Sequence, residues 1–169
     1  MSNVVDYYKY WNTEAIVADL DTKRNPFAVL MDHFEKDLNI GGVIRSANAF
    51  MAERVYYIGQ RKWDRRGAVG THHYTHFTHV SSPNQIQELQ ETYTWVAFEN
   101  DETAEDIRDF VWPERPLIII GNEANGIHPS LLEISQHKIY VPQFGTVRSL
   151  NASTAASIAM YDWVTKNVK

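Results

Sequence analysis

The chain has no cysteine, and it has no apolar run long enough to span a bilayer. Disulfides and thiolate metal sites are therefore excluded, and contact with a membrane is not expected. The N-terminus also lacks the basic and apolar segments of a secretory signal peptide, so we expect a cytoplasmic protein. The 169 residues, 44% of them apolar, suffice for one domain with a substantial core.

Positive charge is also scarce, because 16 Lys and Arg residues face 21 Asp and Glu residues, giving a formal net charge of −5. This balance argues mildly against a nucleic-acid partner, since phosphate binding depends on Lys and Arg. One segment differs: Arg61, Lys62, Arg65 and Arg66 lie around Trp63. Cations interleaved with aromatic rings suit single-stranded RNA, but a solvated surface loop has the same composition. Both interpretations of this basic segment stay open.

Four histidines follow the basic segment, at positions His72, His73, His76 and His79. Imidazoles are common metal ligands, but no carboxylate or cysteine lies among these four. Their spacing also fits no helix pair that would hold an ion. A metal site is therefore not predicted.

Segments that favour strands alternate with segments that favour helices along the whole chain. Strands are expected at residues 27–31, 55–59, 93–99, 116–121 and 137–141. Helices are expected within residues 4–20 and at 39–51, 85–92, 101–111, 128–135 and from 151 onward. The alternation predicts a single-domain α/β fold with a mostly parallel sheet between helices. We expect residues 1–24 to form a helical extension before a domain of residues 25–169.

Three segments combine glycines and polar residues with these predicted elements. They are residues 39–50 (NIGGVIRSANAF), 117–127 (LIIIGNEANGI) and 139–163, where a strand, a loop with Pro142 and Gly145, and an alanine-rich helix follow one another. In this order they resemble motifs 1, 2 and 3 of the SpoU (TrmH-like) RNA ribose 2′-O-methyltransferases of the SPOUT superfamily. The resemblance covers about residues 25 to 165, which is nearly the whole chain.

The resemblance implies a SPOUT-type fold with a trefoil knot in its C-terminal half, although sequence periodicity alone reveals no knot. It also implies S-adenosylmethionine as the methyl donor and a ribose 2′-hydroxyl of RNA as the acceptor. We expect tRNA rather than rRNA, because ribosomal members of the family often carry an added domain. The alternative is a catalytically inactive RNA-binding relative, but such a protein has no need to retain the polar residues of all three motifs.

The same resemblance assigns the catalytic residues. Arg45 matches the essential arginine of motif 1; because its guanidinium stays protonated, we expect it to clamp the target phosphate rather than act as a base. Asn39 is expected to cap the motif 1 helix, and Glu123 to orient amide or guanidinium groups in the site. Ser149 and Asn151 should face the transferred methyl group. The residues expected to line the cofactor pocket are Phe98, Gly121, Val141, Ser149 and Leu150.

A homodimer is the last implication, since family members bring motif 1 of one protomer toward the cofactor pocket of the other. Two exposed surfaces are expected to form the interface. One is the alanine face of the C-terminal helix, which ends at Trp163. The other holds the large rings of Tyr7, Tyr8 and Trp11. The alternative is that these rings fold back onto their own chain.

Overall fold

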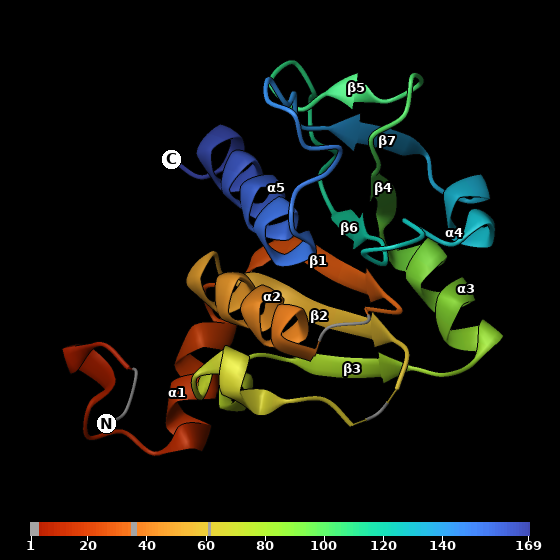
Figure 1. Cartoon of the computed structure of the whole chain (residues 1–169). Helices are drawn as coiled ribbons and strands as arrows, with labels where there is room; N and C mark the ends of the chain where they lie inside the picture. The colour runs from red at the N-terminus through yellow and green to blue at the C-terminus, as the bar shows by residue number, and fades with distance from the viewer. Residues whose placement is uncertain (1–3, 35–36, 61) are drawn as a thin grey trace.

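The computed structural model describes residues 4–34, 37–60 and 62–169. Within these ranges seven strands form one sheet: β1 (Asn25–Asp32), β2 (Ala52–Ile58), β3 (Phe77–Val80), β4 (Thr94–Phe98), β5 (Glu105–Asp106), β6 (Pro116–Ile120) and β7 (His137–Tyr140). The strand order is β3-β2-β1-β6-β4-β7-β5, and every neighbouring pair is parallel (Figure 1). The predicted α/β fold with a parallel sheet is therefore confirmed.

Helices cover both faces of this sheet (Figure 1). The core packs α2 (Asp37–Ala49) and α5 (Ala152–Asn167) against one face, and α3 (Pro83–Thr92) and α4 (Pro129–Glu133) against the other. The remaining helices are α1 (Thr13–Asp21) and three 3-10 turns, η1 (Asp6–Tyr8), η2 (Arg65–Ala68) and η3 (Thr71–His73). The trefoil knot and the division of the chain at residues 24 and 25 stay predictions.

Burial on both faces explains why the central strands are apolar without alternation. In β1, Phe27, Val29 and Met31 pack toward α2 and α5, whereas Ala28 and Leu30 pack toward α3 and α4. All five residues of β6 are buried as well. Parallel strands covered on both faces have this continuous composition, and it made the β6 strand predictable.

The alanine face of α5 lies inside the chain rather than on its surface. Ala155, Ala156 and Ala159 are buried, and the ring of Trp163 packs 4.7 Å from that of Phe27. Small side chains let α5 approach α2 closely, and a hydroxyl contact of 2.7 Å between Ser46 and Ser157 joins the two helices. The prediction that this face forms a dimer interface is therefore wrong, because its apolar area is already used within the protomer.

The prediction of a helix at residues 101–111 is also wrong. The segment holds turns and the two-residue strand β5. Asp101 accepts a hydrogen bond from the backbone N–H of Thr103 at 2.6 Å, and Asp106 accepts one from that of Arg108 at 2.9 Å. Such local bonds from aspartate to the backbone two residues on favour turns over helix. The other predicted helices form, within a few residues of the expected bounds.

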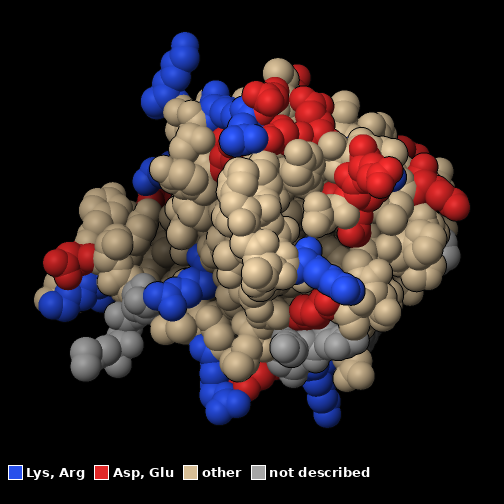
Figure 2. All heavy atoms as spheres, turned by 45° about the horizontal axis from the view of Figure 1, so that its top comes forward, with Lys and Arg blue, Asp and Glu red and all other residues tan. Residues whose placement is uncertain are grey.

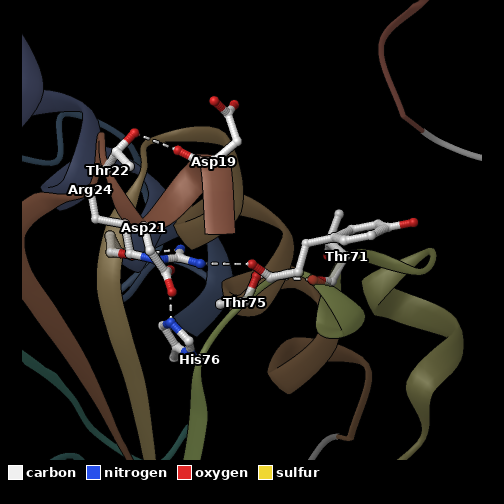
Figure 3. Close-up of polar contacts among 9 residues, drawn as sticks. Asp19, Asp21, Thr22, Arg24, Thr71, Thr75 and His76 are labelled. Carbon is white, nitrogen blue, oxygen red and sulfur yellow. Dashed lines mark hydrogen bonds and ion pairs between the residues drawn. The ribbon is translucent and has the colours of Figure 1, made fainter. Parts of the chain in front are cut away.

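A polar network around Arg24 joins α1 to the amino-terminal edge of the sheet (Figure 3). The Arg24 side chain, only 6% exposed, donates to Asp21 Oδ1 at 2.6 Å, to the carbonyl of Tyr74 at 3.0 Å and to that of Ala52 at 3.4 Å. His76 contacts the same Asp21 oxygen at 2.8 Å. Burial raises the pKa of Asp21, but hydrogen bonds from Arg24 and His76 outweigh it and hold that pKa below its ordinary value. The pairing thus stabilises the fold fully above the ordinary aspartate pKa of 3.8, and this stabilisation is lost as the pH falls through the lowered pKa of Asp21.

Replacement of Arg24 by alanine is expected to lower the free energy of unfolding by about 2 to 3 kcal/mol, because two backbone carbonyls and a carboxylate lose their charged donor. Urea denaturation would measure the change. Arg108→Ala is the matched control, since Arg108 is 66% exposed and, among the residues that the structure describes, pairs with Asp106 of its own turn. It should change the stability by less than about 0.5 kcal/mol. Equal values for the two variants would contradict a structural role for Arg24.

Candidate active site

A cavity of about 340 Å³ opens at the carboxyl ends of β4 and β6, against the start of α5. The carboxyl ends of parallel strands are the usual ligand-binding edge of open α/β sheets. The volume lies in the range of small-molecule sites. Its lining comes from four parts of the chain: residues 98–100, residues 120–126, Gln143, and the start of α5 with the loop before it, which contributes Ser149, Leu150, Ala152 and Ala155.

Most residues predicted to hold the cofactor line this cavity. Phe98, Gly121, Ser149 and Leu150 do so. Val141 is not part of the lining, because its side chain packs against the core cluster below α2 and α5. The structure thus brings four of the five predicted residues together around one space.

Gly121 is glycine because another stretch of backbone passes directly beside it. A Cβ at this position would lie 2.2 Å from the carbonyl carbon of Gly126 and 2.3 Å from the amide nitrogen of Ile127. Two backbone hydrogen bonds of 2.9 Å between Asn122 and Gly126 close the loop that causes this approach. The loop therefore presents backbone rather than side chains to the cavity at this point.

Three predicted catalytic residues, Asn39, Glu123 and Asn151, form a hydrogen-bonded chain that we call the polar triad. The Asn39 amide donates to Glu123 Oε1, and its carbonyl oxygen accepts from Asn151 Nδ2 at 3.0 Å. Asn151 in turn caps α5, accepting from the backbone N–H groups of Ser153 and Thr154. The polar triad joins the three sequence motifs at the edge of the cavity.

The expected capping role of Asn39 is wrong. Helix α2 begins two residues earlier, at Asp37, and the Asn39 side chain is 7% exposed with both of its ends engaged in the polar triad. An asparagine near a helix start is a frequent cap, which explains the expectation. Only the fold shows that Glu123 and Asn151 lie within its reach.

Arg45 lies outside the cavity lining. Its side chain is exposed on α2, away from the buried residues Ile40, Ile44 and Ala47, as the sequence pattern predicted. Among the described residues no hydrogen bond or ion pair engages its guanidinium. The structure therefore leaves Arg45 available to a partner outside this protomer, and it does not place it beside Ser149.

Sequence reasoning missed Glu99, Asn100, Asn125 and Gln143, which also line the cavity. Glu99 accepts a hydrogen bond from the backbone N–H of Ile127 at 3.2 Å, which ties β4 to the loop after β6. A signal was present, because Glu99 and Asn100 directly follow a strand of the parallel sheet. Polar residues at such a carboxyl end frequently face ligands.

The basic segment is exposed where the structure describes it. Lys62, Arg65 and Arg66 are all exposed, and Arg61 lies outside the described residues. Arg66 forms an ion pair of 2.5 Å with Asp64, and this hydrogen-bonded pairing lowers the pKa of the Asp64 carboxyl. In Figure 2 acidic side chains are densest at the upper right of the face, while Lys and Arg side chains are scattered over its top, its left side and its lower part. The net charge of −5 therefore does not describe the surface around η2.

The histidines after the basic segment do not assemble a metal site. In the described part of the chain, no three His, Asp or Glu side chains gather as metal ligands. Burial lowers the pKa of His72, with smaller contributions from His73 and Arg65, so its ring favours the neutral form. Nor does any helix in the described ranges have the length and apolarity to cross a membrane.

A parallel sheet with a polar-edged cavity at the carboxyl ends of its strands defines a ligand-binding α/β protein. The sequence matches the SpoU rRNA Methylase family over residues 26–161, and the chain belongs to this family. It is 25% identical over 155 residues to the tRNA (guanosine(18)-2′-O)-methyltransferase of Aquifex aeolicus, covering 85% of this chain and 71% of that one. It is 30% identical over 140 residues to a putative TrmH family tRNA/rRNA methyltransferase of Staphylococcus haemolyticus, covering 79% and 56%.

A solved structure supports the same assignment. The SpoU methyltransferase AviRb from Streptomyces viridochromogenes, in complex with the cofactor AdoMet, superposes with a TM-score of 0.77 at 26% identity. The match covers 89% of this chain and 62% of AviRb. The chain thus spans less than two thirds of AviRb and of the staphylococcal relative.

Proposed function

We propose that the protein is an S-adenosylmethionine-dependent methyltransferase that acts on ribose 2′-hydroxyls of RNA in the cytoplasm. The observation that carries the proposal is the polar triad, because it joins residues of three separate motifs at the edge of one cavity. Membership of the SpoU family and the likeness to AviRb with AdoMet bound support it.

The cavity fits the proposed cofactor in size and in the character of its walls. When bound, S-adenosylmethionine would supply an activated methyl group to the ribose oxygen. Phe98, Gly121, Ser149 and Leu150 would hold it, largely through backbone groups. Glu99, at the end of β4, adds a carboxylate that can accept hydrogen bonds from a ligand.

The catalytic task of the chain is to orient the ribose hydroxyl and to let its proton leave. We assign Arg45 to the phosphate beside the target ribose, since a guanidinium binds phosphate with two parallel hydrogen bonds. The phosphate or a water molecule then takes the proton. The polar triad would hold the start of α5 and the loop after β6 in place, so that Ser149 faces the transfer.

Methyl transfer from radiolabelled S-adenosylmethionine to RNA from a methylation-deficient host tests the function. Label in ribose 2′-O-methyl nucleosides is the expected result. The alternative is an inactive relative that binds RNA, and RNA binding without any label would support it instead. Failure to bind S-adenosylmethionine at all would contradict both the cofactor and the assigned cavity.

Within this activity we propose tRNA rather than rRNA as the substrate. The Aquifex aeolicus relative, which this chain resembles over 85% of its length, is a tRNA guanosine methyltransferase. Comparison of 2′-O-methyl positions between a wild-type and a deletion strain would identify the nucleotide. A lost methyl group in rRNA alone would refute the choice of tRNA.

We further propose that the active unit is a homodimer. Its support is the separation of Arg45, exposed on α2, from the cavity that its own chain forms. A second protomer would bring its Arg45 to that cavity, which needs a two-fold interface. The rings of Tyr7 and Trp11, 62% and 41% exposed, remain available for such a contact, whereas the alanine face of α5 does not.

Charge reversal at Arg65 and Arg66 is expected to weaken RNA binding without changing S-adenosylmethionine binding. Each lost phosphate contact should flatten the slope of log K against log salt by roughly one unit. Titrations at several salt concentrations would measure it, with Arg108→Glu as the matched control because Arg108 is an exposed arginine in a turn at β5. An unchanged slope in the double variant would show that this segment is a solvated loop.

A further inference from the structure

A second cavity lies at the carboxyl ends of β1, β2 and β3, and the proposed function leaves it unused. Its volume is about 860 Å³, within the range of small-molecule sites. The strands contribute Ile58 and Val80, α3 contributes Ile86, and Leu131 and Ile134 come from α4 and the residue after it. These apolar residues belong to the core on the α3 and α4 face, so this cavity is separate from the one beside α5.

The polar part of this second cavity starts from Asp32, which is 2% exposed. One carboxylate oxygen contacts His33 Nδ1 at 2.6 Å, and the other accepts from the backbone N–H of His128 at 2.7 Å. Because a carboxylate only accepts, the proton of a neutral His33 lies on Nδ1. Its Nε2 is then a hydrogen-bond acceptor that no described residue engages.

His128 has the opposite tautomer. Its Nδ1 lies 2.8 Å from Ser130 Oγ and accepts from the backbone N–H of Ser130 at 3.3 Å, where it caps α4. In this capping arrangement we assign the proton of the neutral ring to Nε2. The two rings therefore offer one acceptor and one donor to a molecule in the cavity. His79 also borders the cavity, but its ring packs against that of Tyr57 on the α2 side of the sheet, with Nε2 donating to the carbonyl of Gly59 at 2.6 Å, so it offers no further donor or acceptor there.

The charge of the cavity decides what kind of molecule fits. No Lys or Arg is among the described residues of the lining, and its one carboxylate, Asp32, already bonds His33 and His128. A phosphate would therefore meet no counter-ion among the described residues of the lining. An uncharged flat ring could pack its faces against the apolar walls. The donors and acceptors on its edge could form hydrogen bonds with the imidazoles and with the amides of Gln60 and Gln90.

The two cavities share a wall. The Asn122 side chain, which lines the cavity beside α5, donates to the backbone carbonyl of His33 at 2.6 Å, and His33 lines the second cavity. Both cavities therefore lie along one edge of the sheet. A single RNA strand crossing this edge can place a ribose at one and a base at the other.

We propose that the second cavity binds a nucleobase of the RNA substrate. The proposal rests on the proposed function for the identity of the RNA, but the binding of a base itself does not require methyl transfer. Its donor and acceptor pattern would hold a base by hydrogen bonds to the edge, while the apolar residues contact its face. The target ribose would lie beside the other cavity, with Asn122 between the two.

Two measurements test this, both on the full chain. In the first, NMR spectra of the histidine ring protons are followed while adenosine, guanosine, cytidine or uridine is added at millimolar concentration. We expect at least one nucleoside to shift the signals of His33 and His128, whereas ribose 5-phosphate and inorganic phosphate do not. Shifts with ribose 5-phosphate but with no nucleoside, or no shifts at all, would overturn the proposal even if the protein methylates RNA.

The second measurement fills the cavity from its rim. Gln90, exposed on α3, lines it, whereas Gln87 is exposed on the same helix and does not. Gln90→Trp should raise the KM for RNA at least tenfold with little change in kcat and in S-adenosylmethionine binding, and it should abolish the nucleoside shifts. Gln87→Trp should behave like the wild type. If Gln90→Trp keeps the wild-type KM and the nucleoside shifts, the base-binding site is refuted. If the wild-type protein shows nucleoside shifts but no methyl transfer, only the proposed methyltransferase activity is refuted.

Discussion

Replacement of Arg45 by alanine is expected to reduce methyl transfer by at least about a hundredfold while S-adenosylmethionine binding stays nearly unchanged. Loss of one well-placed charged donor commonly has a cost of this size, because orientation and charge stabilisation disappear together. The binding of cofactor should persist because Arg45 does not line the cavity beside α5. Single-turnover transfer and calorimetric binding would measure the two effects separately.

A matched control is Arg108→Ala, which removes an exposed arginine that pairs with Asp106 in its own turn. It should retain wild-type turnover. Near wild-type turnover in Arg45→Ala itself would remove this residue from the mechanism. A variant that loses cofactor binding as well would point to a change in the fold rather than in catalysis.

The same variant tests the homodimer. If Arg45 of one protomer acts at the cavity of the other, an Arg45→Ala chain and an Asn151→Ala chain, each inactive alone, should regain part of the activity when co-expressed. In the mixed dimer one cavity then has both an intact polar triad and an intact arginine. Fully active wild-type protein that sediments as a monomer would contradict the shared site.

The parts of the fold that the sequence predicts well are those in which one local pattern dominates. Continuous apolar residues in β6 reflect burial on both faces of a parallel sheet, and Ser82 before α3 is a local helix start. The prediction of a helix at residues 101–111 failed because Asp101 and Asp106 each accept a hydrogen bond from the backbone N–H two residues further on. Whether such a segment forms a turn or a helix depends on its packing against the rest of the chain, and the composition of the segment does not determine this.

The candidate site divides in the same way. Residues of each motif were recognisable, but the contact of Asn39 with Glu123 and Asn151 joins positions 84 and 112 residues apart. A local sequence pattern does not predict which residues so far apart in the chain come into contact. The second cavity was not predicted at all, because its walls come from three strands and two helices whose lining residues look like ordinary core and turn residues in the sequence.

The alanine face of α5 shows how one pattern supports two structures. Small residues at helical spacing allow close approach by any backbone, whether from the same chain or from a partner. Here α2 of the same chain lies against α5. Gly42 leaves room for Ser153, because a Cβ on Gly42 would lie only 3.0 Å from the Cβ of Ser153. Only the presence of α2 decides that this surface is internal.

Substitutions in the polar triad are also expected to have large effects on stability and activity. Each of its hydrogen bonds has a donor and an acceptor side, and paired substitutions can exchange the two. Asn39→Asp should impair both stability and activity: it sets a carboxylate against Glu123 and removes the amide that donates to it. Stability should fall by about 1 to 3 kcal/mol, the range for a buried polar group that loses its partner. Transfer should fall with it, since the start of α5 and the loop after β6 lose their common anchor.

Adding Glu123→Gln to Asn39→Asp is expected to restore much of both losses. The new amide at position 123 can donate to the carboxylate at position 39, which still accepts from Asn151 Nδ2, so the chain of hydrogen bonds is complete again with one of them reversed. Glu123→Gln alone should lose less than Asn39→Asp alone, because the amide oxygen at position 123 still accepts from Asn39 Nδ2, although without the charge of the carboxylate. Urea denaturation and methyl transfer on all four proteins of the cycle give the coupling between the two positions. Recovery of stability without recovery of transfer would show that the ionised Glu123 itself is needed in the reaction, and additive losses would refute the triad as a unit.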